Sequence, residues 1–139
     1  MRSLGIGTIL VGDEELNVAK MLDVMNQRIE YLYDREHTIG HAFFTRLCED
    51  PSLETLAEIF ETKIIPLLQE YFYEDYEKVQ LVLGDNDKDN EFKFVLDQPI
   101  KVPEVFKGNL YVDLPEKGYE IQHKAFLKLE SYKGIAEGL

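Results

Sequence analysis

The sequence lacks several features that would define a function directly. It has no tryptophan, one cysteine, and 15 basic residues against 27 acidic ones, which gives a net charge of −12. Such a charge repels phosphate backbones and excludes an autonomous nucleic-acid-binding domain. The single cysteine, Cys48, has no internal disulfide partner, and its neighbours Leu47 and Glu49 offer no positive charge to activate it. We therefore expect an unreactive thiol in a reducing compartment.

Catalytic and targeting motifs are also missing. The chain has no glycine-rich phosphate loop, no Walker-type acidic strand, no Ser-His-Asp arrangement and no Cys/His metal pattern. His37 and His41 have a ligand spacing, but Gly40 between them disfavours one continuous helix, so we predict no zinc site. With no long apolar run and no signal peptide, we expect a cytoplasmic protein without membrane contact.

The residues that are present predict a folded chain with two parts. Hydrophobic residues make up 45%, and eight Tyr and eight Phe supply large apolar surfaces. The clearest boundary is GDNDKDN at residues 84–90, which lacks the glycine and glutamate that a calcium loop needs at its sixth and twelfth positions. Helical periodicity precedes this boundary and alternation follows it. We predict an α+β, mainly α fold, with a helical bundle in residues 1–85 and a small β-hairpin and terminal helix in residues 86–139.

Within the bundle, apolar residues at three- and four-residue intervals predict a first helix from about Asp13 to Tyr33, with Glu14 and Glu15 in its first turn. We expect no strand in the first eighty residues. Residues 1–12 are interrupted by glycine, and we expect that the chain starts inside a longer protein. A short helix over residues 42–48 should follow, and then a helix capped by Ser52.

Pro66 should mark a helix restart, because proline is tolerated in a first turn. The densest apolar stretch, residues 67–83, should break near residues 74–75. Its tyrosines Tyr71, Tyr73 and Tyr76 either pack in the core or bind a partner. After the boundary, strands are predicted at residues 92–96, 110–113 and 119–122. A last helix should begin at residue 122 or 123.

One short step stands out for its chemistry. Ile39, Gly40 and His41 open the second predicted helix, where unpaired N–H groups and the helix dipole favour an anion. This makes Gly40 and His41 a candidate phosphate-facing site, although a histidine there also serves as a cap or as a packed core residue. Arg28 and Arg35 lie two turns apart and would share one side beside this step if the helix continued that far.

Three ordered blocks carry a family resemblance: NQRIEYLYDREHTIGHAFF at residues 26–44, IIPLLQEYFYED at residues 64–75 and LGD at residues 83–85. Together they resemble the C-terminal part of the AAA+ motor in McrB-type proteins, the nucleotide-hydrolysing subunits of 5-methylcytosine-specific restriction systems. In that family the region forms the helical lid over the nucleotide. The resemblance implies GTP or ATP with Mg²⁺ as cofactor of the parent protein. The fragment alone should hold no cofactor and should not hydrolyse nucleotide.

The resemblance also implies roles and partners. His41, with Gly40 allowing close approach, would act as the second sensor of the terminal phosphates, and Arg28 or Arg35 would contribute from the same side. The implied partners are the rest of the motor, a homo-oligomeric ring and a nuclease subunit, with DNA contacted by other parts of the complex. The alternative function is an autonomous acidic helical interaction module that binds another protein through Tyr71, Tyr73 and Tyr76 without any nucleotide.

Overall fold

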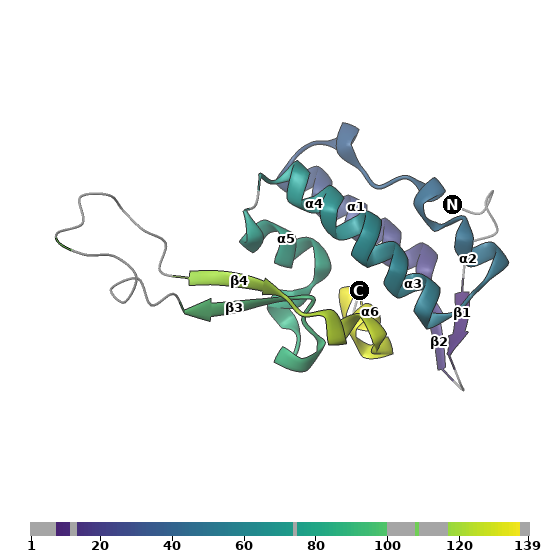
Figure 1. Cartoon of the computed structure of the whole chain (residues 1–139). Coiled ribbons are helices and arrows are strands. Elements are labelled where there is room, and N and C mark those ends of the chain that lie inside the picture. The colour runs from purple at the N-terminus through teal and green to yellow at the C-terminus, as the bar shows by residue number, and fades with distance from the viewer. Residues whose placement is uncertain (1–7, 12–13, 74, 100–107, 109–116, 137–139) are drawn as a thin grey trace.

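The computed structural model of the chain describes residues 8–11, 14–73, 75–99, 108 and 117–136. Helices dominate these residues, and two small antiparallel hairpins accompany them (Figure 1). The predicted class, α+β and mainly α, is therefore confirmed. The α-helices are α1 (Val18–Leu32), α2 (Arg46–Glu49), α3 (Leu53–Ile59), α4 (Ile65–Tyr71), α5 (Tyr76–Leu83) and α6 (Leu129–Ala136). The strands are β1 (Thr8–Val11), β2 (Glu14–Asn17), β3 (Val95–Pro99) and β4 (Lys117–Ile121).

The N-terminal hairpin corrects the sequence prediction. β1 pairs with β2 in a register that places Thr8 opposite Asn17 and Val11 opposite Glu14. The expectation of no strand before residue 80 is therefore wrong, and so is the placement of Glu14 and Glu15 in a first helical turn. α1 begins only at Val18, where the Asn17 side chain accepts a hydrogen bond from the backbone N–H of Lys20 at 3.0 Å. The β-branched residues of β1 favour a strand, and pairing with them takes up the residues before this cap.

The caps and ends of the middle helices can be compared with the prediction. Ser52 caps α3 by accepting a hydrogen bond from the backbone N–H of Thr55. Pro66 lies in the first turn of α4, as predicted, but the expected restart is wrong, because α3 continues through a π-helical turn, Phe60–Ile64, into α4 without a break. The predicted break is also confirmed, because α4 ends at Tyr71 and α5 begins at Tyr76.

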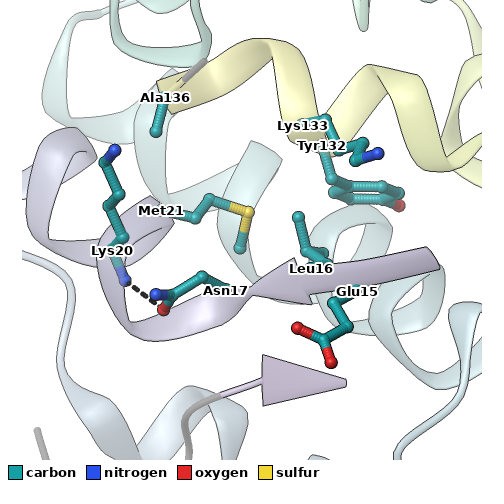
Figure 2. A pocket seen from close by; sticks show the side chains of 8 residues that line it. All are labelled: Glu15, Leu16, Asn17, Lys20, Met21, Tyr132, Lys133 and Ala136. Carbon is teal, nitrogen blue, oxygen red and sulfur yellow. Dashed lines mark hydrogen bonds between the residues drawn. The ribbon is translucent and has the colours of Figure 1, made fainter. Parts of the chain in front are cut away.

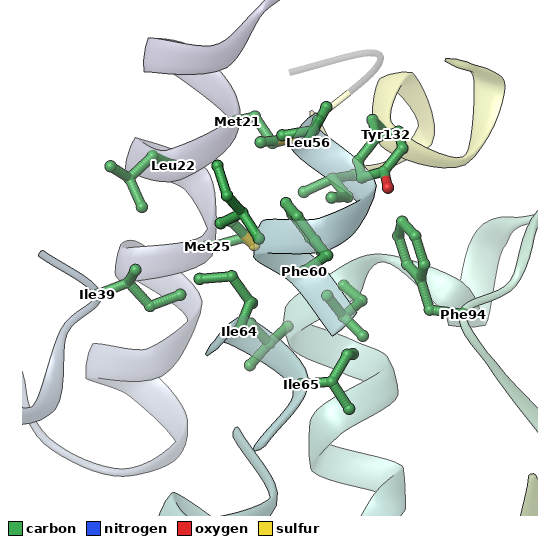
Figure 3. Packing of buried hydrophobic residues seen from close by; sticks show 14 of the residues in the cluster. Met21, Leu22, Met25, Ile39, Leu56, Phe60, Ile64, Ile65, Phe94 and Tyr132 are labelled. Carbon is green, nitrogen blue, oxygen red and sulfur yellow. The ribbon is translucent and has the colours of Figure 1, made fainter. Parts of the chain in front are cut away.

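One buried cluster joins the helices to the C-terminal segment (Figure 3). At its centre the Phe60 ring stacks on Phe94 with 5.4 Å between centroids and meets Tyr132 edge-on at 4.9 Å. The Tyr132 hydroxyl donates to the carbonyl of Phe126 at 2.6 Å, and burial raises the pKa of this phenol far above its ordinary value. Residues on both sides of the predicted 85/86 boundary therefore share a core.

A buried polar group connects the same two parts. Asp85 has no exposed surface, and its carboxylate accepts hydrogen bonds from the Lys88 ammonium at 2.8 Å and from the backbone N–H groups of Phe94 and Val95 at 3.1 and 2.9 Å. We call Asp85, Lys88 and these two N–H groups the junction centre. Gly84, just before it, ends α5 in the left-handed conformation with φ of 74°. The GDNDKDN segment thus uses its first acid to hold the backbone of Phe94 and Val95, which lie after it in the chain.

The C-terminal segment consists of a hairpin and a helix. β3 pairs with β4 from Val95 opposite Ile121 to Pro99 opposite Lys117, and the hairpin extends away from the helices (Figure 1). The strand predicted at residues 92–96 begins later, because Asn90–Phe92 form a 3₁₀ turn. The strand predicted at residues 110–113 lies outside the described residues. The last helix is a 3₁₀ segment, His123–Leu127, followed by α6.

Candidate functional site

The candidate site is built on residues 34–40, which we call the strap, between α1 and the 3₁₀ turn His41–Phe44. The Asp34 carboxylate starts the strap by accepting hydrogen bonds from the backbone N–H groups of Glu36 and His37, each at 2.9 Å. It also lies 2.7 Å from Nδ1 of His37. The hydrogen bond with His37 lowers the pKa of Asp34. The hinge expected from sequence is therefore an ordered turn.

The His37 ring attaches the strap to two helices. Its centroid lies 4.6 Å from that of Tyr33 at the end of α1 and 5.3 Å from that of Tyr71 at the end of α4. Tyr33 in turn contacts the rings of Tyr71 and Phe72, each at 5.9 Å. Contacts of this kind favour tilted and edge-to-face geometry, as observed here. His37, which carried no role in the sequence prediction, is thus an anchor of the strap.

Asn26 in α1 makes the second attachment. Its side-chain oxygen accepts the backbone N–H of Ile39 at 2.6 Å, and its side-chain nitrogen donates to the Ile39 carbonyl at 3.0 Å. The Ile39 side chain is 2% exposed. The sequence already marks Asn26 as unusual. It follows Leu22 by four residues and precedes Ile29 by three, so it lies on the apolar stripe of α1. A polar residue there needs a partner.

Gly40 and His41 follow directly after this attachment. Gly40 is exposed with φ of −80°, and a Cβ added there would meet no atom within 4 Å. His41 begins a 3₁₀ turn of four residues, and a one-turn helix, α2, comes after it. The expected continuous helix over residues 42–48 is therefore wrong. The sequence analysis expected a helix dipole to favour an anion at this step. A turn of four residues carries only a small dipole, so this contribution is small.

The two arginines of the prediction do not lie on one side together. The Arg28 guanidinium donates to the carbonyl of Val82 in α5 at 3.0 Å, and burial lowers its pKa. Two helical residues turn by about 200°, so Arg28 and Asn26 face nearly opposite sides of α1, and Arg28 lies away from the strap. α1 ends at Leu32, so the two-turn relation with Arg35 does not hold. Arg35 is exposed in a 3₁₀ turn and borders a hollow with Gln27, Glu30 and Tyr31.

The three tyrosines proposed for partner binding are in different environments. Tyr71 is half-buried against the strap, and Tyr76 stacks on Tyr119 of β4 at 5.2 Å. Tyr73 is 87% exposed and has a positive φ of 49°. Only Tyr73 of the three presents a largely open ring.

The described part of the chain has hollows outside the strap, the roomiest of about 440 Å³ beside Arg28, Leu81 and Gly84. A pocket of about 190 Å³ lies between the start of α1 and α6, bordered by Leu16, Met21 and Tyr132 (Figure 2). The same described residues contain no group of three metal-ligating side chains. They also contain no helix with the length and apolar character needed to cross a membrane.

The described residues between positions 18 and 83 are mainly helical. Comparison with known families agrees: residues 17–80 match the family described as McrB, alpha-helical lid domain. This stretch runs from the cap of α1 into α5 and is similar to the McrB lid, so the resemblance expected from the sequence is confirmed for these residues. None of the curated proteins matches the chain significantly.

Proposed function

We propose that the chain is the C-terminal lid of a GTP- or ATP-hydrolysing AAA+ motor subunit in a modification-dependent restriction endonuclease. The observation that carries this proposal is the lid match over residues 17–80, which includes the whole strap, with its exposed last residue Gly40, and His41 directly after it. A lid closes over a nucleotide held by a separate core, so it needs an exposed polar step on a rigid frame. Gly40 is exposed next to the pinned Ile39, and His41 follows it directly in the chain.

The chemistry is divided between the lid and the rest of the motor. The phosphate loop and the acidic residues that hold Mg²⁺ belong to the core, because no Walker-type sequence occurs in this chain and its described residues offer no carboxylate cluster for a metal. The bound nucleotide with Mg²⁺ supplies the reacting phosphate. His41 contributes an N–H donor toward the terminal phosphates, and Gly40 leaves room for their approach. Arg35 is a second donor from the strap, whereas Arg28 braces α1 against α5.

The proposal extends to assembly. The motor subunits form a homo-oligomeric ring that works with a nuclease subunit, and DNA is bound by other parts of the complex. Closure of the lid reports the nucleotide state to this assembly.

The test is the variant His41→Ala in the parent motor that contains the phosphate-loop core. Loss of a preorganised donor to the transferring phosphoryl group should lower the rate constant of hydrolysis by about tenfold or more. The matched control is His123→Ala, because His123 is exposed in the C-terminal 3₁₀ segment, 3.8 Å from Glu61 and outside the lid match. Unchanged turnover and unchanged nucleotide affinity in the His41 variant would refute the assignment.

A further inference from the structure

Asn26 forms a paired contact that its place in the helix does not require. It is the ninth residue of a fifteen-residue helix, where asparagine is less favourable than alanine or leucine. Both polar atoms of its amide bond to the backbone of the same residue, Ile39. A partly buried amide is costly unless it is hydrogen-bonded. Here the Asn26 amide pairs with both the N–H and the C=O of Ile39.

Two bonds to one residue fix more than a distance. The N–H and the C=O of Ile39 point in different directions, so an amide that binds both sets the orientation of this peptide segment relative to α1. Burial of the Ile39 side chain at 2% exposure adds a third constraint. The backbone therefore leaves Ile39 in a determined direction, and the next residue is Gly40.

The other end of the strap is held independently. His37 is fixed by the Asp34 carboxylate and by the rings of Tyr33 and Tyr71. Only Thr38 separates this anchor from Ile39. The strap is consequently preformed on the free lid and does not depend on a ligand to order it.

We propose that Asn26 is the positioning residue of the Gly40-His41 step. This inference rests on the proposed function, because it assigns Asn26 a role in presenting His41 to the nucleotide. Asn26 acts through the Ile39 backbone and does not touch the nucleotide itself. Catalytic geometry depends on such supporting contacts, since a displacement of about 1 Å at a reacting group costs on the order of a hundredfold in rate.

The structural arm of the test uses the 139-residue chain. Hydrogen exchange of the Ile39 amide is measured by NMR in the unmodified chain, in Asn26→Ala and in Asn26→Leu. Leucine fits the apolar stripe of α1 and preserves helix propensity, so this variant keeps its fold even where alanine lowers stability. The matched control is Gln27→Ala, which removes the neighbouring amide, an exposed one that donates to Asp23 within α1.

We expect the Ile39 amide to exchange at least about tenfold faster in both Asn26 variants, while the Gln27 variant and the amides of α4 keep the original rates. Equal Ile39 exchange in Asn26→Leu and the unmodified chain would overturn the proposal, because the strap would then be held without Asn26.

The functional arm uses the parent motor and a double-mutant cycle between Asn26→Leu and His41→Ala. A positioning role predicts that each variant slows hydrolysis and that the double variant is no slower than His41→Ala alone. A purely structural role gives independent, additive losses and overturns the inference. If Asn26→Leu retains full turnover while His41→Ala is slow, positioning fails and the proposed function stands. If His41→Ala also retains full turnover, the proposed function itself fails and the inference fails with it.

Discussion

The junction centre and the strap use similar groups in opposite environments. In the junction centre, the Asp85 carboxylate is fully buried, and the side chain of Lys88 is only 3% exposed. In the strap, Asp34 and His37 form the same kind of short contact with 42% and 43% of their side chains exposed. Water screens the strap pair, whereas the buried pair interacts through a medium of low polarity. The comparison teaches that the first site stabilises the fold and the second positions a loop.

The junction centre and the strap also lie in different parts of the sequence. Asp85 joins the lid helices to residues 86–136 by accepting the N–H groups that begin β3. The strap lies within the lid match and ends at an exposed glycine. Changes at the junction should therefore appear in unfolding measurements, and changes at the strap should appear in turnover.

The largest expected effect belongs to Asp85→Ala. The substitution leaves the buried Lys88 ammonium and two backbone N–H groups without their acceptor, and the free energy of unfolding should fall by about 3–5 kcal/mol. Urea denaturation of the chain measures this loss. Asp87→Ala is the control, because Asp87 is exposed in the same 3₁₀ turn and should change stability little. Equal stability of the two variants would show that the junction centre is not the stabilising one.

The second prediction concerns pH. Burial lowers the pKa of Lys88 to about 8, and the nearby Arg28 adds to this shift although Asp85 opposes it. Below pH 8 the lysine is charged in both the folded and the unfolded chain, and between pH 8 and its ordinary pKa of 10.5 only the folded chain releases the proton. The unfolded chain then binds more protons, so stability rises with pH across this interval, by up to about 3 kcal/mol.

The comparison with Lys88→Met isolates this contribution. The difference in unfolding free energy between the unmodified chain and the variant should shift in favour of the unmodified chain as pH rises from 8 to 10.5. Denaturation curves at several pH values measure the shift. A difference that is constant with pH would contradict a buried, desolvated lysine at this position.

The third prediction compares two glycines by the same substitution. Gly84→Ala places a Cβ 2.9 Å from the carbonyl oxygen of Gly134 at a residue with φ of +74°, so it should destabilise the chain by about 1–3 kcal/mol. Gly40→Ala meets no atom and keeps an ordinary φ, so its unfolding midpoint should stay within experimental error. Thermal unfolding of both variants tests the contrast. A larger loss at Gly40 than at Gly84 would reverse the comparison between strap and junction.

Sequence patterns were sufficient for the helices that have clear local signals. Ser52 as a cap, Pro66 in a first turn and the break before Tyr76 all follow from the chemistry of one or two residues, and all three are confirmed. The N-terminal hairpin was missed although its signal was present: a β-branched run is followed by Gly12 and Asp13 and then by residues that can pair with it. The apolar stripe that follows is strong, and it led to the placement of Glu14 and Glu15 in a helix.

The contacts that define the candidate site were beyond local patterns. Asn26 and Ile39 are thirteen residues apart, and Asp85 meets Val95 across ten, so each pairing depends on how the whole chain closes. Periodicity places Arg28 on a helix but does not show which neighbour covers that side. The Gly40-His41 step was found by its composition, whereas the two anchors that hold it required the three-dimensional arrangement.

The π-helical turn described above has a mechanical consequence. Because Phe60–Ile64 carries the chain from α3 into α4 without a break, residues 53–71 form one straight bar about 28 Å long (Figure 1). One end of the bar meets the strap through Tyr71 and His37, and its middle rests on the C-terminal segment through Phe60 and Phe94. The strap and the C-terminal segment are therefore joined through one continuous helical element.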